Sequence, residues 1–124
     1  MLSTNQLADC MPFRVDQVTT NHFESAGSSI AVHQDSKELF DRPIISLRLL
    51  SESILSFGCT GFGMRPSREY TPIPLKRGVV TCMEGYAADT YTHCIRPSDT
   101  VSESMSIIFG RVHKRTGIDI NAHI

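Results

Sequence analysis

The most restrictive feature of this 124-residue chain is that no segment repeats apolar residues with the 3.6-residue period of an amphipathic helix. Short runs rich in β-branched and apolar residues alternate instead with turns rich in Gly, Pro and Ser. The runs with the character of strands are residues 13–23, 30–33, 44–50, 54–57, 73–75, 79–83, 90–95 and 103–112. Strands in this number and spacing predict an all-β fold. We expect a jelly roll, also called a double-stranded β-helix, whose mouth can hold a small ligand.

The strand pattern assigns the chain to one domain, in agreement with its length. Residues 13–112 carry the strands and form the predicted jelly-roll domain. Residues 1–12 form a lead-in, in which residues 3–9 are expected to begin a short helix capped by Ser3 or Thr4. Residues 84–89 are predicted to form a turn, and residues 113–124 a polar tail without an assigned role.

Composition excludes several classes of protein. Hydrophobic residues make up 40% of the chain and its net charge is −1, which argues against global disorder and against a strongly basic surface for nucleic acid, although a local groove stays open. No apolar run reaches the roughly 20 residues that cross a bilayer, and the N-terminus does not read as a secretory signal. The four cysteines form no Cys-x-x-Cys pair, which favours a reducing compartment. We therefore expect a cytoplasmic protein without a membrane partner, either a monomer or a module of a larger polyprotein.

One short motif has the spacing of a metal site. His33 and Asp35 are two positions apart, so in an extended strand both side chains point to the same side. With a second histidine from elsewhere they would form the two-histidine, one-carboxylate face that suits a non-haem Fe(II) with open positions. Three-letter motifs also arise by chance, and the alternative is a solvated loop.

Four blocks of residues, in the same order, resemble the AlkB family of Fe(II)- and 2-oxoglutarate-dependent dioxygenases over about residues 21–112. This resemblance favours a metal site over a solvated loop. The blocks are Asn21-His22-Phe23 with Gly27 and His33-Gln34-Asp35; PIISLRL at 43–49 with ILSF at 54–57; LKRGVVTCMEG at 75–85 with Thr92-His93; and SMSIIFG at 104–110 followed by Arg111. The likeness is greatest to the compact AlkB modules of plant RNA-virus replicases.

The resemblance implies a function and a set of site residues. Fe(II) would be held by His33, Asp35 and His93, and Asn21 would help to bind the cosubstrate 2-oxoglutarate. The activity implied is oxidative demethylation of N-methylated bases, in which an N-methyl group is hydroxylated and leaves as formaldehyde. The substrate would be methylated RNA or single-stranded DNA, with RNA favoured, because the base must be presented outside its stack.

The chain departs from the family where the cosubstrate's carboxylates should bind. The two arginines of the final family block are replaced by Ser104 and Gly110. Arg111 could replace one of them if a β-bulge at Gly110 breaks the strand register. Arg48 is a second candidate for binding the carboxylate, because it shares the side of the predicted strand 44–50 that faces the cosubstrate in the family; alternatively its side chain reaches water at the barrel mouth.

Three readings of the function therefore stay open. The first is the demethylase. The second is a catalytically impaired module that binds metal or nucleic acid and has lost its 2-oxoglutarate arginines, a view to which Phe23 in place of the family's tyrosine adds weight. The third is a jelly-roll oxygenase that acts on a small molecule or a protein side chain. The loop 59–70 carries Arg65, Arg68 and Tyr70, which could contact nucleic acid or simply form a polar surface.

Overall fold

The computed structural model describes residues 14–58 and 70–113. The elements of this part of the chain are β1 (Gln17–Phe23), β2 (Ile30–His33), β3 (Ile44–Leu49), β4 (Ser53–Gly58), β5 (Thr71–Leu75), β6 (Val80–Met83), α2 (Gly85–Asp89), β7 (Thr92–Ile95), a 3-10 turn (Pro97–Asp99) and β8 (Ser104–Gly110). The strands lie within the predicted domain 13–112. The predicted helix at residues 3–9 lies outside the described residues.

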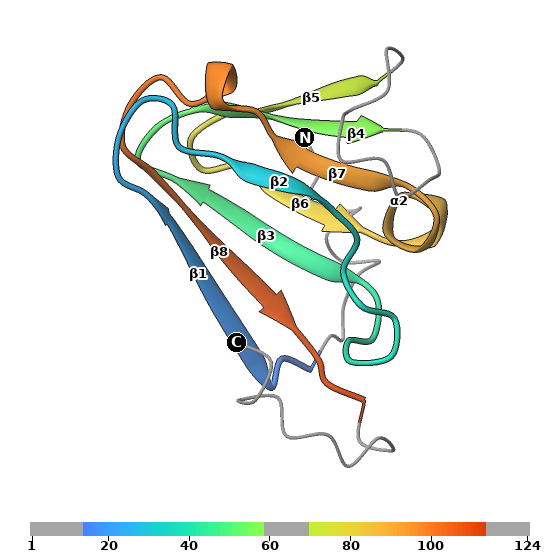
Figure 1. Cartoon of the computed structure of the whole chain (residues 1–124). Coiled ribbons are helices and arrows are strands. Elements are labelled where there is room, and N and C mark those ends of the chain that lie inside the picture. The colour runs from blue at the N-terminus through green and yellow to red at the C-terminus, as the bar shows by residue number, and fades with distance from the viewer. Residues whose placement is uncertain (1–13, 59–69, 114–124) are drawn as a thin grey trace.

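The strands form two antiparallel four-stranded sheets. One sheet has the order β1-β8-β3-β6 and the other the order β2-β7-β4-β5, so the chain crosses from sheet to sheet at every connection except that between β4 and β5. Figure 1 shows the two layers converging at the end where β1 passes to β2 and spreading apart at the end where α2 lies. This arrangement confirms the predicted all-β jelly-roll class.

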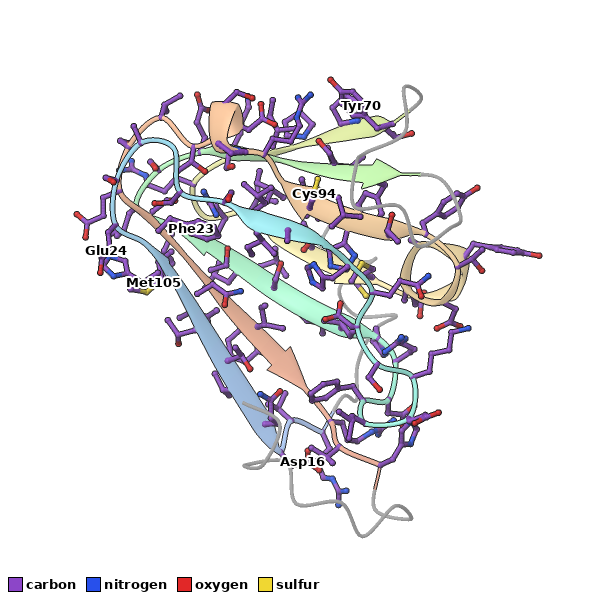
Figure 2. All side chains as sticks on the ribbon, in the orientation of Figure 1. Asp16, Phe23, Glu24, Tyr70, Cys94 and Met105 are labelled. Atoms are coloured by element: carbon purple, nitrogen blue, oxygen red, sulfur yellow. The ribbon has the colours of Figure 1, made fainter. Side chains whose placement is uncertain are left out.

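A small apolar cluster holds the sheets together where they converge. Phe23 at the end of β1 packs with Leu75 and Ile95 of the opposite sheet, and Ile30 and Leu55 border this cluster. Figure 2 shows Phe23 between the two layers. The candidate ligands lie away from this cluster, on the last residue of β2, in the segment after it and in β7.

The structure corrects one local prediction, because residues 84–89 form more than a turn. Gly85–Asp89 is a single turn of α-helix, closed by the Thr90 and Tyr91 amides, which donate to the carbonyl of Tyr86. Gly85 enters it with a φ of 60°, which glycine adopts without strain. One helical turn is too short to show a 3.6-residue period, and for this reason the sequence pattern missed it. Within the described residues no helix combines the length and the apolar character needed to cross a membrane.

Candidate metal centre

Two histidines are brought side by side by the pairing of β2 with β7. His33, the last residue of β2, is the cross-strand partner of His93 in β7. The register shifts between this pair and the other pair of the ladder, Ile30 with Ile95. The two imidazole centroids are 4.3 Å apart. Both rings therefore project from one sheet toward the same point.

Asp35 completes a cluster of three candidate ligands. One of its oxygens lies 4.0 Å from His33 Nε2, and the other lies 3.4 Å from His93 Nε2. One ligand atom from each of the three residues lies within 4.8 Å of the others. Neighbouring ligands of an octahedral cation with bonds of about 2.1 Å are roughly 3 Å apart, so the cluster fits a divalent metal after small movements. Two imidazoles and one carboxylate on one side are the donor set of a non-haem Fe(II) site.

The surroundings of both histidines suit coordination. His33 Nδ1 lies 2.8 Å from the carbonyl oxygen of Ala31, which can only accept, so Nδ1–H donates and Nε2 is the ring nitrogen that faces Asp35. Burial, with a smaller contribution from His33, lowers the pKa of His93 to about 4. The His93 imidazole is therefore neutral at pH 7 and can act as a ligand.

Two side chains tie together the segments that carry the candidate ligands. Arg42 donates from Nη2 to the backbone carbonyl of Asp35 at 2.9 Å and from Nε to the Asp89 carboxylate at 2.9 Å. Gln34 donates from its amide to the Thr90 carbonyl at 2.7 Å. The segment after β2, which bears Asp35, is thus fastened to the segment that leads into β7. We call Arg42 and Gln34 the clamp.

We expect an Arg42→Lys variant to bind Mn²⁺ about tenfold more weakly than the parent chain. Lysine keeps the charge, but its single ammonium cannot hold Asp35 and Asp89 together in the geometry of a planar guanidinium. Losing an outer partner of a ligand typically costs ten- to a hundredfold in metal affinity. Isothermal titration with Mn²⁺ measures the change. The exposed Arg14→Lys is the matched control, and equal affinities in both variants would contradict a role for the clamp.

The three residues lie on the wall of a cavity of about 350 Å³ between the sheets, a size typical of small-molecule sites. Most of its lining is apolar, from side chains such as Ile44, Leu55 and Ile108. A second lobe of about 270 Å³ is lined by two of the candidate ligands, His33 and Asp35, and reaches Gly110. The polar side chains of the larger lobe, apart from the three candidate ligands, are Asn21, Ser46, Thr81 and Ser106.

The structure separates the residues predicted to bind the cosubstrate. Asn21 lines the cavity. Arg48 is buried behind the cavity wall and is only 2% exposed, so its side chain does not reach water as the alternative supposed. Arg111 lies outside the cavity lining, where its guanidinium is paired with Asp41. The amide of Arg42 and then Arg111 lower the pKa of the Asp41 carboxyl.

The proposed β-bulge at Gly110 is wrong. The ladder between β1 and β8 runs without a shift from Phe23 paired with Ser104 to Gln17 paired with Gly110. The Asp16 amide continues it by donating to the Gly110 carbonyl at 3.1 Å. Because the register holds, Arg111 is not turned toward the cavity by a bulge.

The residues predicted to contact nucleic acid are only partly described. Arg65 and Arg68 lie outside the described residues. Tyr70 stands at the start of β5 and does not line the cavity. Its hydroxyl accepts a hydrogen bond of 2.8 Å from Arg96, whose guanidinium carbon lies 4.4 Å from the ring centroid.

Sequence reasoning missed the clamp and the hydroxyl groups of the cavity. Gln34 stands between His33 and Asp35, and in an extended chain the middle residue points to the opposite side from its two neighbours. This was a signal that the Gln34 side chain is directed away from the metal. Arg42 precedes a proline in a polar connector, where nothing marks it. Ser106 lies within the predicted strand 103–112 and lines the cavity, but the sequence pattern gave it no role.

A jelly roll with two histidines and one carboxylate on its cavity wall defines a class of mononuclear non-haem metal proteins. In a comparison with protein families, the model of the 2OG-Fe(II) oxygenase superfamily matches residues 3–118. The chain therefore belongs to this superfamily. The family confirms the predicted cofactors, Fe(II) and 2-oxoglutarate, and the cluster described above fits the metal.

Among curated proteins, the chain is similar to vertebrate members of the AlkB group, which confirms the AlkB-like resemblance. It is 40% identical over 100 residues to RNA demethylase ALKBH5 of Bos taurus, covering 78% of this chain and 25% of that protein. It is 34% identical over 91 residues to the tRNA (carboxymethyluridine(34)-5-O)-methyltransferase ALKBH8 of Macaca fascicularis, covering 72% and 13%. The chain thus spans about a quarter of the length of the demethylase relatives. The closer likeness to viral replicase modules stays a prediction.

One solved structure supports the fold alone. A Thermotoga maritima protein described as a predicted oxalate decarboxylase superposes with a TM-score of 0.50 at 14% identity, covering 91% of this chain and 76% of that one. It has a fold of the jelly-roll type, as this chain does.

Proposed function

We propose that this chain is the catalytic core of a dioxygenase that uses Fe(II) and 2-oxoglutarate to demethylate N-methylated bases in RNA. The observation that carries the proposal is the meeting of His33, Asp35 and His93 on the wall of a cavity. The similarity to RNA demethylases over most of the chain supports the substrate class. It does not favour the alternative of a catalytically impaired module.

In this proposal a bound Fe(II) would supply the oxidising chemistry: O₂, 2-oxoglutarate and the N-methylated base would give succinate, CO₂ and an N-hydroxymethyl base, which releases formaldehyde and leaves the unmodified base. The chain's own residues hold and orient the reactants. His33 and His93 would present ring nitrogens to the metal, and the Asp35 carboxylate would contribute the negative charge. The apolar cavity wall excludes water from the reacting groups.

The substrate must enter as an unstacked base, so single-stranded methylated RNA is the proposed partner, with single-stranded DNA second. Arg65, Arg68 and Tyr70 are proposed to contact its backbone or bases. The domain is proposed to span residues 13–112 and to work as a monomer or as a module of a larger protein. We place it in the cytoplasm because its cysteine spacing favours a reducing compartment.

We expect the chain, given Fe(II), 2-oxoglutarate and a methylated RNA oligonucleotide, to form succinate and formaldehyde in equal amounts. The two products report the two halves of one reaction. Mass spectrometry of the oligonucleotide identifies the demethylated base, and oligonucleotides that each carry a different methylated base define the preference. The matched control is the same sequence without the methyl group.

Each other outcome points to a specific failure. Succinate without formaldehyde from any oligonucleotide would overturn the nucleic-acid substrate and favour an oxygenase for another class of molecule. Neither product would overturn the enzyme proposal. Faster turnover of single-stranded DNA than of RNA with the same methylated base would overturn the preference for RNA.

A further inference from the structure

Arg48 is a buried cation whose hydrogen bonds all go to neutral groups. It lies in β3, and its guanidinium donates from Nε to the Ser51 carbonyl at 3.0 Å, from Nη1 to Ser106 Oγ at 3.2 Å and from Nη2 to Ser104 Oγ at 2.7 Å. The ring of Phe23 covers it, with 4.9 Å from the guanidinium carbon to the ring centroid. These contacts fix the side chain in one position.

No carboxylate of the described residues forms an ion pair with Arg48. An arginine keeps its charge at any physiological pH, and burial of an unpaired charge is costly. Hydroxyl and carbonyl oxygens satisfy the N–H groups, but they leave the net charge without a counter-ion. A site of this kind is suited to an anion that arrives from outside the chain.

Strand register places this charge directly behind the cavity wall. Across the sheet, Ser106 of β8 stands between its partners Asn21 of β1 and Arg48 of β3, so the three side chains share one face. Asn21 and Ser106 line the cavity, whereas Arg48 does not. Because Ser106 Oγ accepts from Arg48, its own hydrogen is free to donate into the cavity.

The cavity has a polar end around this hydroxyl. Ser46 and Thr81, which pair across β3 and β6, share a hydrogen bond of 2.6 Å and line the same cavity. The cluster of His33, Asp35 and His93 lines the same cavity. One cavity thus contains a cluster that can hold a metal and hydroxyl donors backed by a positive charge, the arrangement that a ligand with two separated acidic groups needs.

The small side chain of Ser104 explains how Arg48 on β3 can supply the positive charge that an arginine on β8 would otherwise supply. Ser104 is fully buried, and its small side chain leaves the space that the guanidinium fills. A long side chain at position 104 would compete with Arg48 for this space. The small residue at position 104, where the family has an arginine, and the arginine at position 48 on the neighbouring strand are therefore compatible with each other: the Arg48 guanidinium fills the space that Ser104 leaves.

We propose that Arg48, acting through the Ser106 hydroxyl, binds the carboxylate of 2-oxoglutarate that lies away from the metal, in place of the arginine that β8 lacks. This inference rests on the proposed function for the identity of the ligand. Ser106 contacts the carboxylate, and Arg48 is a positioning residue that supplies the charge. The Arg48 guanidinium is 3.2 Å from the Ser106 hydroxyl oxygen, so only this hydroxyl would separate its positive charge from the carboxylate. At so short a range opposite charges attract strongly in a buried site.

Isothermal titration of the full chain with Mn²⁺ present tests the proposal with two probes. These are 2-oxoglutarate and 2-oxopentanoate, which has the same five-carbon chain but lacks the second carboxylate. The parent chain is expected to prefer 2-oxoglutarate. In Arg48→Met the affinity for 2-oxoglutarate falls at least tenfold while that for 2-oxopentanoate is unchanged. The exposed Arg14→Met is the control and retains the preference.

Two further variants keep the test decisive if Arg48→Met does not fold. Ser106→Ala removes only the hydroxyl that joins the guanidinium to the cavity, and we expect about tenfold weaker binding of 2-oxoglutarate. The exchange variant, Arg48→Ser with Ser104→Arg, returns the charge to β8 and is expected to bind 2-oxoglutarate within about threefold of the parent chain. A merely structural role for Arg48 would change the affinity for both probes alike.

The outcomes separate this inference from the proposed function. If the parent binds 2-oxoglutarate and Arg48→Met or Ser106→Ala binds it equally well, the role of Arg48 is overturned and the dioxygenase proposal stands. Equal loss of affinity for both probes also overturns it. If the parent chain binds neither probe and forms no succinate, the proposed function itself fails.

Discussion

An Asp35→Asn variant will bind Mn²⁺ at least about a hundredfold more weakly than the parent chain and will form no succinate. The substitution keeps the size of the side chain but removes the one negative charge among the three candidate ligands. The two imidazoles carry no negative charge, so nothing else in the cluster offsets the charge of a divalent cation. Loss of a ligand should exceed the ten- to hundredfold cost of losing an outer partner.

Stability measurements separate loss of the site from loss of the fold. Without metal, the unfolding free energy of Asp35→Asn should stay within about 0.5 kcal/mol of the parent, as for other substitutions outside the core. Mn²⁺ should then raise the melting temperature of the parent but not that of the variant. Glu24→Gln, which alters an exposed carboxylate outside the cluster, is the matched control. A variant that binds Mn²⁺ as tightly as the parent would exclude Asp35 as a ligand.

A Phe23→Ala variant will lose about 3 to 5 kcal/mol of unfolding free energy. Phe23 is 3% exposed and packs with Leu75 and Ile95 where the two sheets converge. Its removal leaves a cavity in a small core and uncovers the Arg48 guanidinium. Domains of this kind have about 5 to 15 kcal/mol in total, so the variant should be largely unfolded near 37 °C.

Chemical denaturation followed by circular dichroism measures this loss. Phe23→Leu fills part of the space and should cost less than half as much. Val18→Ala, on the same strand but 55% exposed, should change the unfolding free energy by no more than about 0.5 kcal/mol. If Phe23→Ala were no more destabilising than Val18→Ala, the cluster would not be the core of the domain.

The fold could be predicted from local patterns because most strands are short runs of β-branched and apolar residues bounded by turn residues. The run 30–33 has the predicted bounds of β2, and the predicted strand 103–112 contains β8. The number and spacing of these runs favoured a jelly roll, and four motifs in a fixed order added the resemblance to a family of metal-dependent dioxygenases. The same motifs named His33, Asp35 and His93, whose ligand atoms the structure places within 4.8 Å of one another.

Features that depend on distant contacts could not be read from the chain. In the clamp, Arg42 binds Asp89, which is far from it in the sequence, and neither residue belongs to a recognisable motif. The helical turn of α2 is too short for a periodic signal. The environment of Arg48 depends on which hydroxyls face it across β8, and register alone does not give the distances of its hydrogen bonds.

The pairing of β2 with β7 joins two histidines that are about 60 residues apart in the chain. Closing so long a loop costs entropy before any contact repays it, and non-local strand pairing of this kind folds slowly. Until β2 and β7 pair, the chain carries His33 with Asp35 on one segment and His93 on another. The complete set of three candidate ligands therefore exists only in molecules that have finished this sheet.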